Sequence, residues 1–326
     1  MNRFEYASPA TTDEAVRMLE SSFDDAAIVA GGTDLLSLMK DFVVEPKRLV
    51  SLGGIEELRG IRSGADGGLV IGAMTTIDEL LASDAVRTGY PGVAQAAEGI
   101  ASLQMRAMGT VGGELMQRPR SWYFRRGLGL LAQQDGTSLV EAGVHRDHAA
   151  YGNSGPAKFV HASSLAPILV ALDANVTVAS AQGTRRISAA QLFVIPAYDD
   201  ARETSLAPNE ILTAIELPGA APHCATVEIR HRKGLDWPEA AAACVLRFEG
   251  PKVSAARVVL GHVAPTPWMV DVREALLGRV PDDAAAEAAG EAAASGATPL
   301  ADNGHKVQLA RAATRRAVLR AAQRDF

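Results

Sequence analysis

The sequence of 326 residues predicts an α+β protein in three parts. Short apolar runs typical of strands lie between stretches with helical periodicity. Clustered glycines at 53, 54 and 60 suggest a first boundary. The last third differs from the rest because three strand-like runs there alternate with helices. We therefore expect parts spanning 1–55, 56–217 and 218–326, the last being a three-stranded antiparallel sheet with helices.

The first part opens with a helix signal. Thr11 and Glu14 have the spacing of a capping box, in which each side chain bonds a backbone amide of the other residue. The apolar run that follows predicts a buried strand, because it is short and ends abruptly at two glycines. The expected elements after the helix are a strand over 26–30, a helical turn over 35–39 and a strand over 48–52.

The second part is mixed and contains one unusual segment. Thr76 and Glu79 form another capping-box pattern. Residues 117–160 are polar, contain glycine and arginine, and show little periodicity, so we expect no long element there. The remaining expected elements are strands over 69–73, 175–179 and 211–217, and helices over 76–81, 91–100 and 165–172.

The third part alternates strands and helices. Its expected strands cover 225–230, 240–248 and 253–263, and its expected helices cover 268–278, 283–294 and 304–324. The stretch 281–301 is crowded with Ala, Glu and Gly, which also fits a linker. We favour a surface helix and loop there.

Composition and charge narrow the class of protein. The net charge of −6 argues against nucleic acid as a partner, because phosphate binding needs concentrated Lys and Arg. No apolar run reaches the length of a membrane helix, and the N-terminus lacks the apolar core of a signal peptide. We expect a cytoplasmic protein, although export with a signal-bearing partner would leave no trace. The two cysteines, Cys224 and Cys244, lie in strand-like surroundings and are expected in the core.

Two glycine turns carry the strongest functional signal. The first, residues 30–35, follows a strand and opens a short helix, and the second covers residues 109–113. Glycine permits a positive φ and lets a ligand approach the backbone, and successive free amides form an anion site. Each turn alone is more simply a tight turn without a ligand. Together they favour a site that grips the two phosphates of a dinucleotide from opposite sides.

Weaker patterns are better explained without a ligand. Residues 127–132 fit a relaxed dinucleotide fingerprint, but no βαβ unit surrounds them. His145 and His148 have a spacing possible for metal ligands, yet no third ligand accompanies them, so we expect solvated loop histidines. The basic and aromatic run 118–126 could clamp a single strand of nucleic acid. The net charge favours a contact within the protein or with another subunit.

At four segments the chain resembles a known family: residues 30–36, 104–113, 165–174 and 263–268. With these motifs it is similar, over nearly its whole length, to the FAD-binding (medium) subunit of the molybdenum hydroxylases. That family includes xanthine dehydrogenase, carbon monoxide dehydrogenase and bacterial aldehyde dehydrogenases. The resemblance implies a two-part FAD-binding domain of the PCMH/vanillyl-alcohol-oxidase type, followed by the C-terminal α+β domain.

The resemblance also implies the cofactor contacts. The two glycine turns would bind the FAD pyrophosphate, and residues further along would approach the flavin ring from the C-terminal domain or pack on it. Plain core packing is an equal alternative for the ring contacts, Ile195, Lys233 and Trp237. The implied cofactor-binding residues are Val29, Ala30, Gly31, Gly32, Thr33, Asp34, Leu35, Leu36, Thr110, Gly112, Gly113, Gln117, Ser164, Ile195, Lys233 and Trp237.

Three departures from the family pattern stand out. Glu114 occupies the position where the family usually has Asn, and Ser164 a position where many members have Asp. Residues 117–162 resemble an insertion that in some relatives holds a [4Fe–4S] cluster through four cysteines. Here Ser121 stands where the first cysteine is expected and the segment has none, which excludes a four-thiolate [4Fe–4S] cluster in this chain. The segment then resembles a remnant that keeps its shape and a docking role.

By resemblance, the chain is an electron-transfer subunit. Substrate would be hydroxylated on a molybdenum cofactor in a large molybdopterin-binding partner, and electrons would pass through two [2Fe–2S] clusters of a small partner to FAD in this chain. A soluble acceptor such as NAD⁺, oxygen or a quinone would then take them. This chain would supply no catalytic acid or base and no metal ligand. Two alternatives stay open: a flavin-free structural subunit, motivated by Glu114 and Ser164, and a stand-alone FAD oxidase of the vanillyl-alcohol type.

Overall fold

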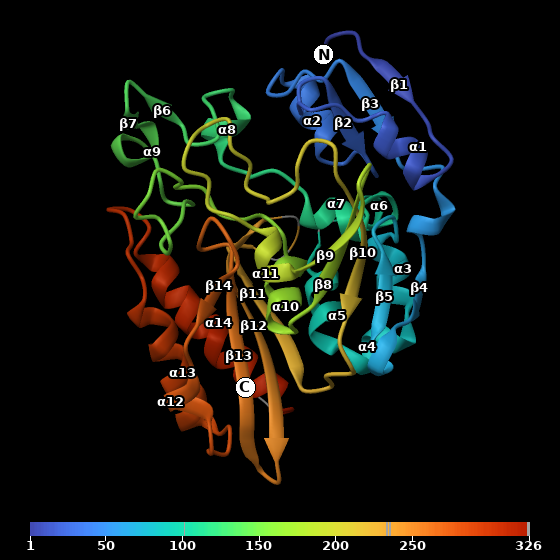
Figure 1. Ribbon diagram of the computed structural model, residues 1–326. Coiled ribbons are helices and arrows are strands. Elements are labelled where there is room, and N and C mark those ends of the chain that lie inside the picture. The colour runs from blue at the N-terminus through green and yellow to red at the C-terminus, as the bar shows by residue number, and fades with distance from the viewer. Residues whose placement is uncertain (101, 233, 235, 325–326) are drawn as a thin grey trace.

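The computed structural model describes residues 1–100, 102–232, 234 and 236–324. Three main sheets follow one another along the chain, and each lies within one of the three predicted parts (Figure 1). The N-terminal sheet and the C-terminal sheet lie at opposite ends of the molecule, with the middle sheet and its helices between them (Figure 1). The boundaries at 55 and 217 stay predictions.

The N-terminal part is a small parallel sheet with strand order β1-β3-β2. The predicted strands and helical turns are confirmed. Thr11 caps the first helix by accepting a hydrogen bond from the Glu14 N–H at 3.2 Å, but the Glu14 carboxylate accepts from the Ala10 N–H instead of completing the capping box. The elements are β1 (Glu5–Ala7), α1 (Thr12–Arg17), β2 (Ala26–Val29), α2 (Leu35–Lys40) and β3 (Arg48–Ser51).

The middle part is an antiparallel sheet with strand order β4-β5-β10-β8-β9. Its strands are β4 (Ile61–Ser63), β5 (Leu69–Gly72), β8 (Asn175–Ser180), β9 (Gly183–Ser188) and β10 (Ile211–Leu217). One face packs on a core built with the helices of this part, and the other carries Ala179 and Ile211 against α1. The full capping box of Thr76 and Glu79 is present. The helices are α3 (Ile77–Ala82), α4 (Asp84–Gly89), α5 (Pro91–Glu98), α6 (Leu103–Met108), α7 (Val111–Leu115), α10 (Leu165–Ala171) and α11 (Ala189–Leu192), with short 3₁₀ turns at Glu56–Leu58 and Ala65–Gly67.

The polar segment after α7 has only short elements, as predicted: α8 (Trp122–Arg125), β6 (Gln133–Gln134), β7 (Thr137–Ser138) and α9 (Leu139–Ala142). The prediction that His145 and His148 are solvated is wrong, since they are only 5% and 3% exposed. The His145 ring accepts from the Asp302 N–H at 3.1 Å, and the His148 ring bonds the Ser121 hydroxyl at 3.0 Å. The His145 contact holds the segment against the C-terminal part, and the His148 contact lies within the segment.

The C-terminal sheet has four antiparallel strands rather than three, in the order β11-β12-β13-β14. The predicted helix over 268–278 is wrong in its first half, because Trp268 and Val270 pair with β13 as a short strand. The linker alternative for 281–301 is excluded by α13, which Asp282 caps by accepting from the Ala285 N–H. The elements are β11 (Cys224–Arg230), β12 (Pro238–Glu249), β13 (Lys252–Gly261), β14 (Trp268–Val270), α12 (Arg273–Leu276), α13 (Asp283–Ser295) and α14 (His305–Ala321).

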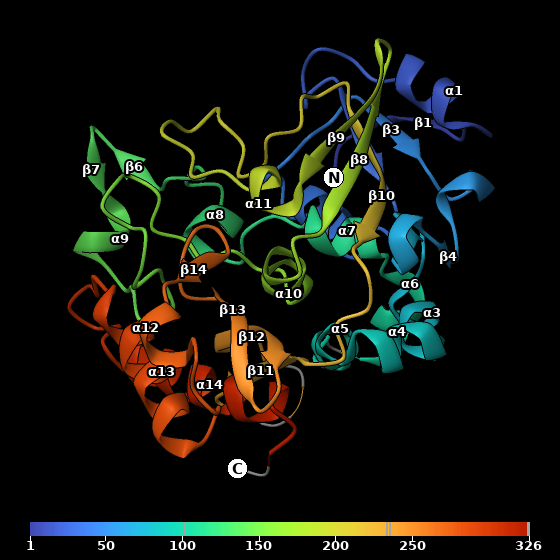
Figure 2. The ribbon, with the colours of Figure 1, turned by 60° about the horizontal axis from the view of Figure 1, so that its bottom comes forward.

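Helices cover both faces of this sheet (Figure 2). Side chains alternate between faces along a strand. Ala242 and Cys244 therefore pack toward α13 and α14, whereas Ala243 and Cys224 join the core around α5 and α10. Both cysteines are buried and free, as predicted. Among the described residues, no helix combines the length and hydropathy that a membrane span requires.

Candidate functional site

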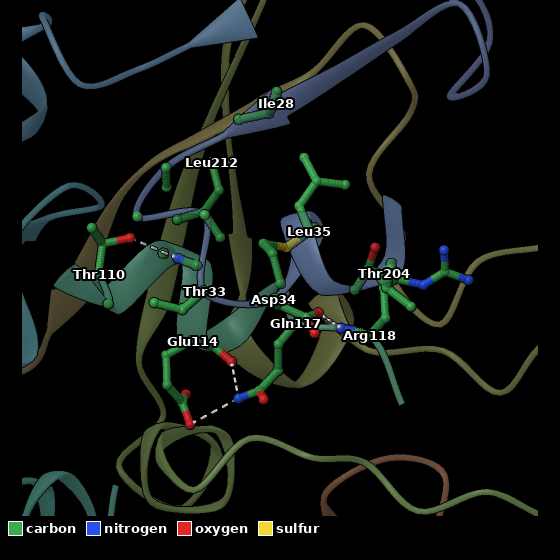
Figure 3. A pocket seen from close by; sticks show the side chains of 18 of the residues that line it. Ile28, Thr33, Asp34, Leu35, Thr110, Glu114, Gln117, Arg118, Thr204 and Leu212 are labelled. Carbon is green, nitrogen blue, oxygen red and sulfur yellow. Dashed lines mark hydrogen bonds between the residues drawn. The ribbon is translucent and has the colours of Figure 1, made fainter. Parts of the chain in front are cut away.

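A cavity of about 510 Å³ lies where the three parts meet. This volume falls within the range of roughly 300–1,000 Å³ that small-molecule and cofactor sites occupy. Both glycine turns and the start of the polar segment line it (Figure 3). The loop from residue 202 to 210, the start of β10, and Trp237 of the C-terminal part complete the lining. The cavity is therefore built by segments distant in sequence, with the two turns on its wall.

Most of the predicted cofactor-binding residues line this cavity: Ala30, Gly31, Gly32, Thr33, Asp34, Leu35, Thr110, Gly112, Gly113, Gln117, Ser164 and Trp237. Val29 does not, because its side chain packs between Met39 and Leu49. Leu36 and Ile195 are exposed and lie outside the lining, Ile195 at 43% exposure. Lys233 lies outside the described residues.

The first glycine turn presents free backbone amides. Gly32 has φ +72°, a left-handed conformation that reverses the chain after β2. Among the described residues, no acceptor takes the N–H groups of Gly32, Thr33 and Asp34. Successive unpaired amides in such a turn form a concave anion site. The prediction of an anion site at this turn therefore has a geometric basis.

The second turn differs from the first because most of its backbone amides already donate to other protein groups. Val111 and Gly112 donate to the Thr75 and Ala73 carbonyls, each at 2.8 Å, and Gly113 donates to the Thr110 hydroxyl oxygen at 3.1 Å. The prediction of a second set of free amides is wrong. The Thr110 hydroxyl is buried on the cavity wall, and its own proton has no acceptor among the described residues (Figure 3). This turn thus offers a hydroxyl donor.

The glycines at these turns are required by protein contacts. A Cβ on Gly31 would lie 1.8 Å from the Met108 carbonyl oxygen, and one on Gly112 would lie 2.8 Å from the Ala73 Cβ. The expectation that their missing Cβ atoms make room for a ligand is therefore wrong for these two positions. Glycine there lets the first turn touch the residue before the second turn, and the second turn touch the end of β5. The contact holds the two turns side by side on the cavity wall.

Asp34 ties the polar segment to the first turn. Its carboxylate accepts from Arg120 at 2.7 Å, from Arg125 at 2.8 Å and from the Arg118 N–H at 2.8 Å. Arg118 in turn pairs with the buried carboxylate of Glu203. The run 118–126 therefore makes contacts within the protein, as predicted. The Asp34 carboxylate is occupied by these hydrogen bonds, so only the backbone amide of Asp34 remains for a ligand.

The same network reaches the C-terminal part. The Arg120 guanidinium lies over the Trp237 ring, 4.5 Å from its centroid, which is the geometry of a cation–π contact. Burial lowers the pKa of Arg120 to about 10, against the attraction of Asp34. Trp237 is 47% exposed and lines the cavity. Arg120, which is bonded to Asp34, therefore holds the Trp237 ring in place beside the cavity.

The cavity wall carries a buried acid, Glu114, at the position where the resemblance leads us to expect Asn. Glu114 accepts from the Ser164 N–H at 2.8 Å and from the Gln117 amide at 3.2 Å, and it also accepts from the Ser163 hydroxyl. Gln117 also accepts from Arg120 at 2.8 Å. Burial raises the pKa of Glu114 to about 7. Gln117 and Ser164 thus line the cavity while holding Glu114.

One loop of the cavity lining, residues 202–210, was not identified from the sequence. Glu203 and Thr204 of this loop line the cavity, and the Arg202 guanidinium lies 3.9 Å from the centroid of the Phe23 ring. No motif marks this loop, so only its contacts in the fold reveal it. Within the part of the chain that the structure describes, no group of His, Cys, Asp and Glu is arranged to hold a metal ion.

Comparison with known proteins accounts for this architecture. Residues 2–220 match the model of the FAD binding domain in molybdopterin dehydrogenase, and residues 225–322 match the CO dehydrogenase flavoprotein C-terminal domain. The carbon monoxide dehydrogenase medium chain of Hydrogenophaga pseudoflava is 32% identical, over 92% of this chain and 89% of that protein. The aldehyde oxidoreductase FAD-binding subunit of Escherichia coli is 31% identical, over 95% of this chain and 96% of that subunit.

A solved structure agrees with these sequences. A chain of carbon monoxide dehydrogenase from Hydrogenophaga pseudoflava superposes with a TM-score of 0.77 and 30% identity, covering 99% of this chain and 98% of that chain. The fold and the cavity define a flavin-binding subunit of an oxidoreductase. The chain belongs to the family of FAD-binding medium subunits of the molybdenum hydroxylases.

The contact between the turns predicts a large effect of one methyl group. Gly31→Ala forces the first turn away from the Met108 carbonyl, and we expect the free energy of unfolding to fall by at least about 2 kcal/mol. Urea unfolding followed by circular dichroism measures this. Gly155→Ala is the control, because a Cβ there meets no atom within 4 Å. Equal stability of the two variants would contradict the contact.

The Asp34 network predicts a second effect. Asp34→Asn removes the charge that balances Arg120 and Arg125, and we expect a loss of roughly 3 kcal/mol in the free energy of unfolding, since two partly buried cations are left uncompensated. Asp41→Asn, at an exposed position of the same part, should change stability little. Limited proteolysis should also cut the Asp34→Asn variant faster within residues 118–126. If neither the cleavage rate nor the free energy of unfolding changed, the Asp34 ion pairs would not be what anchors residues 118–126.

Proposed function

We propose that the cavity binds FAD and that the chain passes electrons between partner clusters and an external acceptor. The observation that supports this most is that two different donor sets line one cavity, the free amides of Gly32, Thr33 and Asp34 in the first turn and the Thr110 hydroxyl in the adjacent second turn. Amide and hydroxyl donors suit the diphosphate of a dinucleotide. The family membership supplies the identity of that dinucleotide.

The residues of the chain bind, orient and shield the cofactor. Apolar side chains such as Ile28, Leu35 and Leu212 line the cavity and keep water from it (Figure 3). Trp237, held by Arg120, offers an aromatic surface to a flat ring. The bound flavin supplies the electron-transfer chemistry. No residue of this chain is assigned as a catalytic acid or base, and contacts from Lys233 and Ile195 to the flavin ring stay proposals.

The partners follow from the names of the relatives. Those proteins are called medium chains and FAD-binding subunits, which supports assembly with other subunits. We infer a large partner with a molybdenum cofactor and a small partner with two [2Fe–2S] clusters, with NAD⁺, oxygen or a quinone as acceptor. The chain has two cysteines, buried on opposite faces of one sheet, and this supports the absence of a [4Fe–4S] cluster. A cytoplasmic site, without membrane or nucleic-acid contact, is part of the same proposal.

The two alternatives gain no support from the site. A flavin-free structural subunit has no need of an open cavity with unpaired donors, whereas this cavity has both. A stand-alone oxidase needs a substrate-binding domain over the flavin. The C-terminal sheet instead carries helices on both faces.

A flavin assay with a matched pair of variants tests the proposal. The purified chain should carry FAD with a visible absorption band, and Thr110→Val should weaken the affinity for FAD by about tenfold, because a hydrogen bond to a charged group is lost. Thr110→Ser keeps the hydroxyl and should bind FAD with nearly the wild-type affinity. Thr184→Val, on an exposed strand, is the control. Isothermal titration of flavin-stripped protein measures each affinity, and wild-type protein that never binds FAD would refute the proposal.

A further inference from the structure

Two buried carboxylates lie behind the inner wall of the cavity, linked by one serine. Glu114 of α7 accepts from the Ser164 backbone N–H at 2.8 Å, and the Ser164 hydroxyl donates to Glu228 of β11 at 2.5 Å. Glu114 is only 8% exposed, yet it lines the cavity together with Ser164. The three residues come from three different elements or turns, so the fold brings the two acids together.

Only one of the two acids has a cationic partner. Arg230 pairs with Glu228 at 2.5 Å. No Lys, Arg or His nitrogen of a described residue lies within 4.0 Å of the Glu114 carboxylate, and its donors are neutral. A buried carboxylate that lacks a cation and faces a second carboxylate favours its protonated form. The geometry therefore points to Glu114 as the acid that carries the proton.

The hydrogen bonds also indicate which oxygen of Glu114 carries that proton. Glu114 Oε1 accepts from the Gln117 side-chain NH₂ (Figure 3) and from the Ser164 N–H, two groups that can only donate. The other oxygen, Oε2, faces the Ser163 hydroxyl, a group that can donate or accept. Ser163 also accepts from the Ala166 N–H at 2.9 Å and has a second lone pair. A proton on Oε2 is therefore compatible with every neighbour.

We propose that Glu114 is a proton-binding group of the cavity wall, which exchanges one proton with solvent and so switches the charge beside the bound cofactor. The proton site on Glu114 concerns this chain alone. The effect of its charge on the cofactor rests on the proposed function, since it requires FAD in the cavity. By resemblance, Asn is the residue expected at this position, and the acid found here is what permits such a switch.

The other charged groups nearby leave this assignment intact. His161 and His262 are buried, and burial lowers the pKa of each to about 3, so both rings are neutral at pH 7. The His262 ring lies 3.8 Å from Glu228. Arg120 attracts Glu114 from the polar segment, but its guanidinium is bonded to Asp34. Arg230, already paired with Glu228, is the remaining cation.

The sign of the pH effect follows. The pKa of Glu114 is raised to about 7 in the folded chain, by burial first and also by repulsion from Glu228. Its contribution to stability is therefore present at pH below about 4, the value in an unfolded chain, and is lost as the pH rises through about 7. Because FAD is anionic, its affinity should fall over the upper part of the same window. By linkage, bound FAD should raise the pKa of Glu114 further.

Infrared spectroscopy and FAD titration of the full chain test the proton site and its effect on the cofactor. In flavin-stripped protein, the wild-type minus E114Q difference should show a protonated-carboxyl band that disappears around pH 7. E228Q should move that midpoint to lower pH, because the repelling charge is gone. Wild-type affinity for FAD should be several-fold weaker at pH 8.5 than at pH 6, and E114Q should show no such slope. E249Q, at an exposed position, should keep both the band and the slope.

Each outcome has a definite meaning. Absence of the band at every pH from 5 to 9 would overturn the proton site, and a band that titrates without any change in FAD affinity would overturn the coupling to the cofactor. If FAD never binds, the proposed function fails while the infrared titration still decides the proton site. Were E114Q not to fold, E114N supplies the neutral reference, since Asn is the residue expected at this position by resemblance.

Discussion

The backbone at Gly31 passes so close to the Met108 carbonyl that no side chain fits between them, and the cavity depends on this contact. It sets the distance between a turn of the N-terminal sheet and a turn of the middle part. The free amides of the first turn and the Thr110 hydroxyl of the second then face one space. Glycine is needed because two backbones must touch, and the positive φ of Gly32 turns the amides toward the cavity.

The polar segment has a clear structural task in this arrangement. It lacks the cysteines that its resemblance would suggest, yet its arginines converge on Asp34 and Glu203 and cover Trp237. The N-terminal part, the middle part and the C-terminal part are thereby tied together around the cavity. This segment has no cysteine, and its contacts close the site. Its buried histidines, bonded to Ser121 and to the Asp302 N–H, serve the same packing.

Much of the fold could be predicted from periodicity and turn chemistry. The strands, most helices and the Thr76 capping box follow from local pattern, and so do the two glycine turns. What could not be predicted depends on tertiary contacts. The strand at Trp268 forms because β13 offers it an edge, and the amides of Gly112 and Gly113 are used by neighbours that sequence does not reveal. His145 and His148 are buried, and His145 bonds the Asp302 N–H in a turn between α13 and α14, about 150 residues further on.

A comparison of two flavins tests the central claim most directly. FMN shares the flavin ring and one phosphate with FAD but lacks the diphosphate bridge and the adenosine. If the two turns hold that bridge, flavin-stripped protein should bind FAD on the order of 100-fold more tightly than FMN in isothermal titration. Equal affinities for the two flavins would show that the turns do not hold a diphosphate, and the account of the cavity would be contradicted.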